Sequence, residues 1–247
     1  MVAVAVIGAR GRMGSTVVGA VGDAPDLEVV ARLDAGDAIT TDSLGGADVA
    51  VDFTVPSQTE ANVHACLDAG VDVVVGTTGW DDESLDRVRA HAEQAGRCVL
   101  IAPNFAMSAV LAMRFAAIAA PYFESAEVIE MHHPDKVDAP SGTATATARG
   151  IAAARAHAGR GPVPDATRTD PLGTRGGVVD GIHVHAVRLR GLTAHEEILL
   201  GNPGEQLVLR TDSFDRSSFM PGVLYGVRHV GEHPGLSVGL DVLMGLA

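Results

Sequence analysis

A single lysine, Lys136, lies shortly after a pair of adjacent histidines, His132 and His133, and side chains of these types can move a proton. Every other permanently charged basic side chain is an arginine. An ammonium group loses its proton when it is desolvated or crowded by other cations, whereas a guanidinium keeps it. The alternative is a lysine that stands by chance on a solvated loop. The two neighbouring histidines favour proton transfer.

A predicted helix that begins directly after Pro140 can add an anion site to these groups. Its first residues are Ser141, Gly142 and Thr143, and it extends to about His157. The N–H groups at a helix N-terminus lack partners within the helix and attract negative charge. This combination favours an anionic substrate that takes up a proton. A metal site at the histidine pair is disfavoured, because adjacent strand residues point to opposite faces and no cysteine or carboxylate spacing completes a ligand set.

A glycine-rich turn follows the predicted strand Val2–Ile7 and opens a helix. The turn consists of Gly8, Ala9, Arg10, Gly11, Arg12, Met13 and Gly14. Glycines at such positions let the backbone approach a pyrophosphate that faces the helix N-terminus. A turn with this spacing can also be purely structural.

Asp34 gives the turn a more specific reading, because it ends the next strand about twenty residues after the last glycine. A carboxylate there can accept hydrogen bonds from the ribose hydroxyls of NAD. An ordinary turn aspartate is the alternative. Arg10 and Arg12 can receive the 2′-phosphate of NADP, so we expect the chain to use both NADH and NADPH. We expect no metal cofactor.

Two further strand ends carry small or polar residues that can line a binding crevice. They are Gly76, Thr77 and Thr78 in one segment, and Ala102, Pro103, Asn104 and Phe105 in the other. Ligands of open α/β sheets bind at the carboxyl ends of the strands. We therefore expect these residues to contact the nicotinamide half of a dinucleotide.

The first hundred residues alternate strands with helices. The predicted strands are Val2–Ile7, Leu27–Asp34, Asp48–Phe53, Val71–Val75 and Cys98–Ala102, and the predicted helices cover about 13–21, 57–69 and 82–95. This alternation implies right-handed crossovers and a parallel sheet. The chain therefore falls in the α/β class.

The pattern changes after Asn104, where we place a domain boundary. Helices are expected over 106–120, 141–157 and 217–230, and strands over 126–132, 182–190, 195–200 and 206–211. Short connections between the last three strands predict antiparallel hairpins. The segment 160–180 reads as a mobile surface loop, and an apolar tail follows the final helix. His183, His185 and His195 are expected on the faces of the second sheet.

Composition excludes several other classes of protein. The formal net charge is −13, which argues against nucleic-acid binding. Cys66 and Cys98 fit neither a metal site nor a disulfide framework and read as buried thiols. No apolar run is long enough to span a membrane, and no signal peptide is recognisable. We expect a cytoplasmic protein.

The chain closely resembles one family over essentially its whole length, the 4-hydroxy-tetrahydrodipicolinate reductases, also called dihydrodipicolinate reductases. The residues that carry the resemblance are the turn 8–14, the segments 75–79 and 102–105, and above all Glu130-Met131-His132-His133, Lys136 and Asp138-Ala139-Pro140-Ser141-Gly142-Thr143-Ala144. One departure is Met107-Ser108, where relatives often have glycine at the second position.

The resemblance implies a Rossmann-type nucleotide domain, 1–105 with 215–247, and an α+β domain with an open mixed sheet, 106–214, which binds substrate and forms a homotetramer. It implies that His132 and Lys136 are the catalytic pair and that His133, Ser141, Gly142 and Thr143 contact a cyclic dicarboxylate. The implied reaction reduces 4-hydroxy-tetrahydrodipicolinate with NADH or NADPH, in lysine and diaminopimelate biosynthesis.

Two other readings of the sequence compete with this one. A different NAD(P)-dependent dehydrogenase, such as a homoserine or sugar dehydrogenase, would share the glycine-rich turn but not the histidine–lysine string. A nucleotide-sensing regulator would lack convergent acid groups. The string between Glu130 and Ala144 favours the reductase over both.

Overall fold

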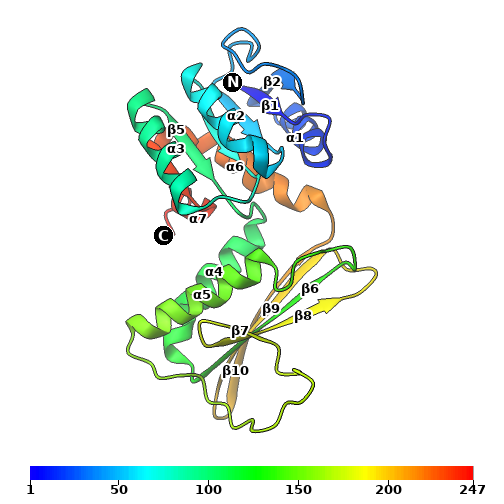
Figure 1. Ribbon diagram of the computed structural model, residues 1–247, viewed down its shortest axis with the longest axis vertical. Helices are drawn as coiled ribbons and strands as arrows, with labels where there is room; N and C mark the ends of the chain where they lie inside the picture. The colour runs from blue at the N-terminus through cyan, green and yellow to red at the C-terminus, as the bar shows by residue number, and fades with distance from the viewer. Residues whose placement is uncertain (247) are drawn as a thin grey trace. The chain divides into compact units, whose positions relative to one another are not determined.

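The structure is a computed structural model that describes residues 1–246, and it divides into two compact units. Unit 1 comprises Met1–Ala106 and Arg216–Ala247, and unit 2 comprises Met107–Asp215. The chain therefore leaves unit 1, builds unit 2 and returns (Figure 1).

Unit 1 is built on a sheet of six parallel strands in the order β11-β5-β4-β3-β1-β2. The strands are β1 (Val2–Ile7), β2 (Leu27–Leu33), β3 (Val49–Asp52), β4 (Asp72–Val75), β5 (Cys98–Ile101) and β11 (Gly235–Val238). The helices are α1 (Arg12–Asp23), α2 (Pro56–Asp68), α3 (Asp82–Ala95), α6 (Met220–His229) and α7 (Leu240–Leu243). This arrangement confirms the expected Rossmann-type α/β fold.

The central strands of unit 1 are apolar without interruption because helices cover both of their faces. Val63 of α2 and Val88 of α3 belong to the core that includes Val73 and Val75 of β4. Val74 points the other way, toward Gly226 of α6, and α6 also contacts α1. The carboxyl ends of the strands, where the predicted nucleotide residues lie, are thus held by a core on each side.

The C-terminal segment differs from the single helix expected over 217–230. A 3-10 turn occupies Arg216–Phe219, and α6 begins at Met220, next to a proline that suits the first turn of a helix. The tail after α6 contains β11, which pairs in parallel with β5. The sequence pattern missed this strand because it is only four residues long, begins at Gly235 and is followed directly by Gly239.

Unit 2 contains a mixed sheet of five strands in the order β10-β9-β6-β8-β7. The strands are β6 (Ser125–His132), β7 (Gly177–Val179), β8 (Ile182–Arg188), β9 (Ala194–Asn202) and β10 (Glu205–Ser213). Helices α4 (Met107–Ala119) and α5 (Gly142–His157) cover one face (Figure 1). The other face carries no helix of the described chain, which confirms the expected open mixed sheet.

The core of unit 2 is assembled from small residues. Ala116 of α4 and Ala148 of α5 are fully buried, and they meet Val128 of β6 and Ile198 of β9. Alanines let the two helices approach each other and the sheet closely. The alternate residues of each strand point to the open face.

The predicted hairpin between 182–190 and 195–200 was wrong. Strand β6 lies between β8 and β9, parallel to β8 and antiparallel to β9. The connection passes the end of β6, where the Leu189 N–H donates to the His132 carbonyl at 3.0 Å. Short connections also permit such a step across one strand. The hairpin between β9 and β10 is confirmed, with Gly204 at a φ of +84°.

The segment 160–180, expected to be a mobile loop, contains β7, which pairs with β8. Its turn is held by the Asp170 carboxylate, which accepts hydrogen bonds from the N–H groups of Thr174 and Arg175 at 2.7 and 2.9 Å. Arg175 in turn donates to Glu127 on β6. The loop is therefore attached to the open face of the sheet.

Candidate active site

The turn between β1 and α1 has the geometry of an anion-binding turn. Gly8 has a φ of +79°, and a β-carbon there would lie 2.7 Å from the Phe53 carbonyl oxygen. A β-carbon at Gly14 would clash with the Gly8 carbonyl. Gly11 is the N-cap of α1 and provides no side-chain cap, so the helix begins with its N–H groups unshielded by a side chain.

A cavity of about 400 Å³ adjoins this turn, within the size range of small-molecule sites. It lies at the carboxyl ends of β1, β2 and β3. Among its lining residues are Gly8, Gly11, Asp34, Phe53, Thr54 and Asn62. The last three come from the segment after β3 and were not among the site residues predicted from the sequence.

Asp34 lies in the wall of this cavity and is also part of the turn. Its Oδ2 accepts a hydrogen bond from the Arg10 N–H at 2.9 Å, and the exposed Arg10 guanidinium is 3.7 Å away. Asp37 supports Asp34 by accepting its N–H at 2.8 Å. The carboxylate predicted to bind a ribose thus has its position fixed by the glycine-rich turn 8–14.

A buried aspartate, Asp52, organises the next strand ends and was missed by the sequence analysis. The hydroxyls of Thr54, Thr59 and Thr77 donate to its Oδ1 at 2.9 to 3.1 Å. The Asn62 amide donates to Oδ2 at 2.8 Å. The Thr77 hydroxyl, predicted to contact a cofactor, is therefore engaged inside unit 1, and it ties the end of β4 to the end of β3.

The other predicted cofactor residues divide into surface and core positions. Thr78 and Pro103 are exposed, and the Asn104 side-chain oxygen accepts the Ala106 N–H at 2.8 Å. Ala102 is buried, and the buried Phe105 ring packs 5.9 Å from the Phe53 ring, measured between centroids. Ala102 and Phe105 can therefore meet a ligand only through main-chain atoms.

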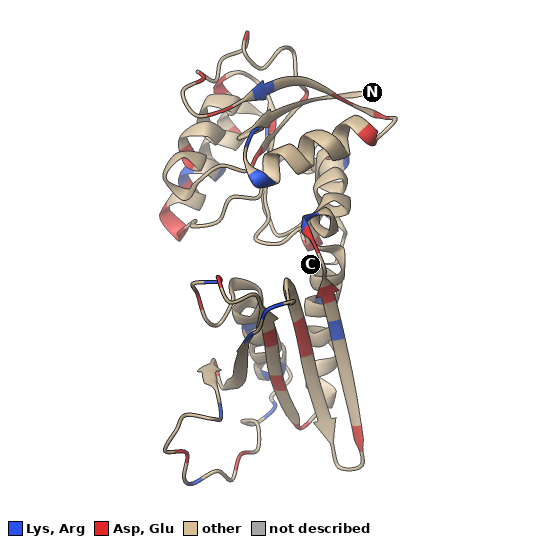
Figure 2. Cartoon of the chain, turned by 90° about the vertical axis from the view of Figure 1, so that its right-hand side faces the viewer, with Lys and Arg blue, Asp and Glu red and all other residues tan. Residues whose placement is uncertain are grey.

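Unit 2 places acidic residues inside its strands (Figure 2). Glu130 on β6 has no exposed surface. Arg188 of β8 holds it in a two-pronged contact, with Nη1 and Nη2 each 2.8 Å from a carboxylate oxygen. Burial by itself raises the pKa of Glu130, but the hydrogen bonds from Arg188 and His132 outweigh it and place that pKa below its ordinary value. Glu130 is therefore ionised at neutral pH.

His132 lies beside this carboxylate, with Nδ1 2.6 Å from Glu130 Oε2. Burial lowers the pKa of His132, the contact with Glu130 opposes that effect, and the charges of Lys136 and Arg188 lower it further. His132 is thus an imidazole near one negative and two positive groups, and neighbours of these kinds set the pKa of a histidine.

Lys136 lies in the loop after β6 and is partly covered, with 21% of its side chain exposed. Its Nζ donates to Asp138 Oδ1 at 2.8 Å, and this hydrogen bond lowers the pKa of the Asp138 carboxyl. Arg188 donates to the Asp138 carbonyl at 2.7 Å, which joins the loop to the carboxylate that holds His132. The structure therefore brings the two predicted catalytic residues into one network.

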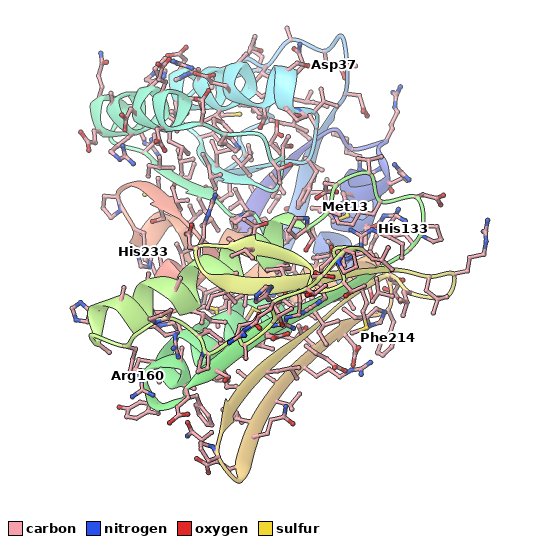
Figure 3. All side chains as sticks on the ribbon, turned by 60° about the horizontal axis from the view of Figure 1, so that its bottom comes forward. Met13, Asp37, His133, Arg160, Phe214 and His233 are labelled. Carbon is pink, nitrogen blue, oxygen red and sulfur yellow. The ribbon has the colours of Figure 1, made fainter. Side chains whose placement is uncertain are left out.

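The predicted substrate-binding residues lie at the start of α5 and on the same loop. Ser141 is buried and caps the helix: its Oγ accepts the Ala144 N–H at 3.2 Å, and its own N–H donates to Glu130 at 3.1 Å. Gly142 and Thr143 form the first turn, and His133 is exposed. Figure 3 shows His133 and Arg160, which follows α5, at opposite ends of unit 2.

Glu196 is a second buried carboxylate of unit 2, and it lies directly opposite Glu130 in the β6–β9 register. The Thr147 hydroxyl of α5 donates to it at 2.7 Å. Burial raises the pKa of Glu196 to about 7, and the charge of Glu130 adds to this effect. The pairing of the two buried glutamates depends on the register of β6 with β9 and was not predicted from the sequence.

The three histidines expected on the faces of the second sheet each have a partner within unit 2. His183 and His185 lie on β8, and the buried His195 contacts Asp212 at 2.6 Å. Cys66 and Cys98 are free, buried thiols, as expected.

In residues 1–246 there is no group of three or more His, Cys, Asp or Glu side chains arranged to hold a metal ion. No helix of this part of the chain is long and apolar enough to cross a membrane.

The parallel sheet of unit 1 and the glycine-rich turn after β1 define a class of protein, those with a Rossmann-type unit of the kind that binds dinucleotides. Two family models match the chain, "Dihydrodipicolinate reductase, N-terminus" over residues 2–105 and "Dihydrodipicolinate reductase, C-terminus" over residues 108–244. The chain belongs to the dihydrodipicolinate reductase family.

Individual relatives support this assignment over the whole length. The protein named 4-hydroxy-tetrahydrodipicolinate reductase from Beutenbergia cavernae is 66% identical over 244 residues, which are 98% of each chain. A dipicolinate-bound dihydrodipicolinate reductase from Paenisporosarcina sp. TG-14 is 39% identical, with a TM-score of 0.87 over 98% of this chain and 99% of that one.

More distant structures share the fold alone. An amine dehydrogenase from Mycobacterium smegmatis has a TM-score of 0.64 over 97% of this chain and 95% of that one, at 13% identity. The high sequence identity to reductases over the whole chain therefore favours the reductase family. It disfavours another type of dehydrogenase and a nucleotide-sensing regulator.

Proposed function

We propose that the chain reduces 4-hydroxy-tetrahydrodipicolinate to tetrahydrodipicolinate, with His132 and Lys136 supplying the proton. One observation carries the proposal: His132, Lys136 and the start of α5 belong to a single hydrogen-bonded network around Glu130. A relative of the same family binds dipicolinate, a flat ring with two carboxylates, which resembles the substrate.

Carboxylate binding follows from the groups at the start of α5. The helix dipole and the N–H groups of Gly142 and Thr143 favour a negative group there. His133, exposed on the adjacent loop, can hold a carboxylate as well. With both carboxylates of the ring held, its orientation would be fixed before reaction.

The reaction consumes one reduced nicotinamide and one proton and releases the substrate hydroxyl as water. The nicotinamide, when bound, supplies the hydride. His132 and Lys136 supply the proton, a step that typically contributes about 10²–10⁴-fold to the rate. Glu130, held by Arg188, would accept the Nδ1–H of His132 throughout this transfer.

Cofactor binding is proposed for unit 1. The turn 8–14 would hold the pyrophosphate, and Asp34 the adenosine ribose, next to the cavity that both line. The exposed Arg10 would accept the additional phosphate of NADPH. Gly76, Thr78, Pro103 and Asn104 would approach the nicotinamide half from the ends of β4 and β5. We propose that no metal takes part.

The open face of the unit 2 sheet is the proposed contact of a homotetramer. Val187 and Val208, on strands β8 and β10, are both exposed on the sheet. Such apolar positions fit a surface that is covered by another subunit. Light scattering of the purified chain would show four subunits per particle, and a monomer would contradict the proposal. We propose that the tetramer works in the cytoplasm.

The direct test of the function is oxidation of NADH by the purified chain, followed at the absorbance of the reduced nicotinamide. The substrate is generated in the cuvette by the synthase that makes it, and a parallel reaction lacks that synthase. We expect oxidation only in the complete mixture, with NADH or NADPH and equally in the presence of EDTA. If neither cofactor is oxidised, the proposed reaction is wrong. If EDTA stops the reaction, a metal takes part.

A further inference from the structure

Glu130 is a fully buried carboxylate at which three segments of unit 2 meet. Its Oε2 lies 2.6 Å from His132 Nδ1 at the end of its own strand, and its Oε1 accepts the Ser141 N–H at 3.1 Å. Arg188 of β8 contacts both oxygens. These contacts use the usual acceptor positions of a carboxylate, so no position is left for a substrate.

The ionisation of Glu130 determines which nitrogen of His132 carries hydrogen. An ionised carboxylate can only accept hydrogen bonds, so Nδ1 must be the donor at 2.6 Å. In the neutral ring Nε2 is then unprotonated, and in the charged ring Nε2–H is the proton that can leave. Proton exchange by His132 is thereby directed to Nε2.

The same carboxylate fixes the place of the helix N-terminus relative to that ring. Ser141 would otherwise present a buried N–H without an acceptor, and such a group is costly. Because Ser141 caps α5, its bond to Glu130 sets where the first turn begins. The proton donor and the anion-binding turn therefore share one anchor.

We infer that Glu130 is a positioning residue of the acid site: it holds His132 as the Nδ1–H tautomer and fixes the α5 N-terminus at a set distance from Nε2. The inference rests on the proposed reduction of a cyclic dicarboxylate and deepens it. In the transfer, the Nε2–H bond of the imidazolium breaks, the proton goes to the substrate, and the ring is left neutral with Nδ1–H still bound to Glu130. Solvent returns the proton afterwards, and no group of the protein is oxidised or reduced.

The test compares Glu130→Gln with Glu127→Gln. Glu127 lies on the same strand and also contacts one arginine and one histidine, but on the open face. A glutamine side chain can donate a hydrogen bond as well as accept one. In Glu130→Gln, His132 is therefore no longer restricted to the Nδ1–H tautomer. We expect kcat to fall about 10²-fold or more, as for a misoriented catalytic histidine, with the KM for NADH within about twofold of wild type.

The tautomer itself can be read by NMR of the chain labelled with ¹⁵N-histidine, without substrate and at a pH where the imidazole is neutral. The His132 signal is the one that His132→Asn removes. Wild type and Glu127→Gln should show Nδ1–H, and Glu130→Gln should show Nε2–H or a mixture. If Glu130→Gln keeps Nδ1–H, or keeps kcat within about twofold of wild type, the inference is overturned.

The role of Glu130 can be tested even if the variant Glu130→Gln does not fold. If Glu130→Gln does not fold, the double variant Glu130→Gln with Arg188→Met takes its place. It also removes the buried positive charge that has lost its partner, and it is expected to fold. The double variant should show the same change of tautomer. Because the NMR signal needs no turnover, it still decides the role of Glu130 if the wild-type chain proves inactive on the proposed substrate.

Discussion

Strand β6 carries two glutamates with the same kinds of partner on opposite faces of one sheet. On the open face, Glu127 contacts Arg175 at 2.6 Å and His185 at 2.8 Å. On the face covered by α5, Glu130 contacts Arg188 at 2.8 Å and His132 at 2.6 Å. We call these sets the open trio and the covered trio.

The difference between the trios is their access to water. The Glu127 side chain is 28% exposed in the single subunit, so water or a polar group of a covering subunit can replace a lost partner. The open trio attaches the 160–180 loop and should contribute less to stability than the covered trio. Glu130 has no exposed surface, so a lost partner leaves a charge that nothing replaces. A fixed proton donor can be built only from the second kind of set.

The largest expected difference concerns the two histidines. His132→Asn should lower kcat/KM by about 10²–10⁴-fold, because it removes a proton donor. His185→Asn, its counterpart in the open trio, should stay within about threefold of wild type. Steady-state kinetics of both variants, with light scattering to check assembly, would measure this. Equal losses would mean that the trios do not differ in function.

The two arginines should differ in their effect on stability. Arg188→Met leaves Glu130 as a buried charge without its main partner and should lower the free energy of unfolding by about 3 kcal/mol or more. Arg175→Met should lower the free energy of unfolding much less, because the Glu127 side chain is 28% exposed in the single subunit rather than fully buried. Urea denaturation at neutral pH measures both. If the Arg175 variant is the less stable one, our view of the two faces is wrong.

Glu196, beside the covered trio, predicts a pH dependence. Its pKa in the folded chain, about 7, is above its ordinary value of 4.5. The stability that this group contributes is therefore complete below pH 4.5 and is lost as the pH rises through 7. Glu196→Gln removes this loss, so from pH 5 to pH 8 the variant should gain on the order of 2–3 kcal/mol in unfolding free energy relative to wild type.

Its neighbour Glu197 provides the control for that experiment. Glu197 points to the open face and contacts Arg210, and Glu197→Gln should show no comparable gain over the same pH range. Denaturation curves of the three proteins at several pH values would give the comparison. If the difference in unfolding free energy between Glu196→Gln and wild type did not change with pH, Glu196 would be ionised in the folded chain over the whole pH range.

The smallest expected effect lies in unit 1 and touches neither trio. Asp34→Ala should weaken NADH binding about tenfold and NADPH binding less, because only NADH relies on the carboxylate at its ribose. At saturating cofactor, kcat should remain near wild type. Fluorescence titration of both cofactors measures the effect. A larger loss for NADPH would remove Asp34 from the ribose site.

The fold was predictable where local patterns decide it. Runs rich in apolar residues identified the first five strands of unit 1, and the glycines of the turn 8–14 identified the start of α1. The place of β6 in the middle of its sheet was not predictable, because strand order depends on contacts between distant segments. The four residues of β11 carry too little pattern, and their pairing with β5 exists only in the folded chain.

The residues of the candidate site also fall into those that local patterns predict and those that only contacts between distant segments bring together. The histidine–lysine string and the helix start after Pro140 are local, and the sequence was sufficient to select them. The partners Glu130 and Arg188 come together only when β8 aligns with β6. A usable signal did exist: Glu130 occupies an apolar-facing position of its strand, and a carboxylate there needs a partner. The same signal applies to Asp52 at the end of β3.

Labelling of Lys136 tests most directly whether the dicarboxylate binds beside the covered trio. The chain offers an amine reagent only this side chain and the N-terminal amine of Met1. With NADH present throughout, saturating dipicolinate should slow labelling of Lys136 about tenfold or more and leave Met1 unchanged. Mass spectrometry measures both sites, and Lys136→Arg confirms the assignment. Equal labelling of Lys136 with and without the dicarboxylate would contradict the account.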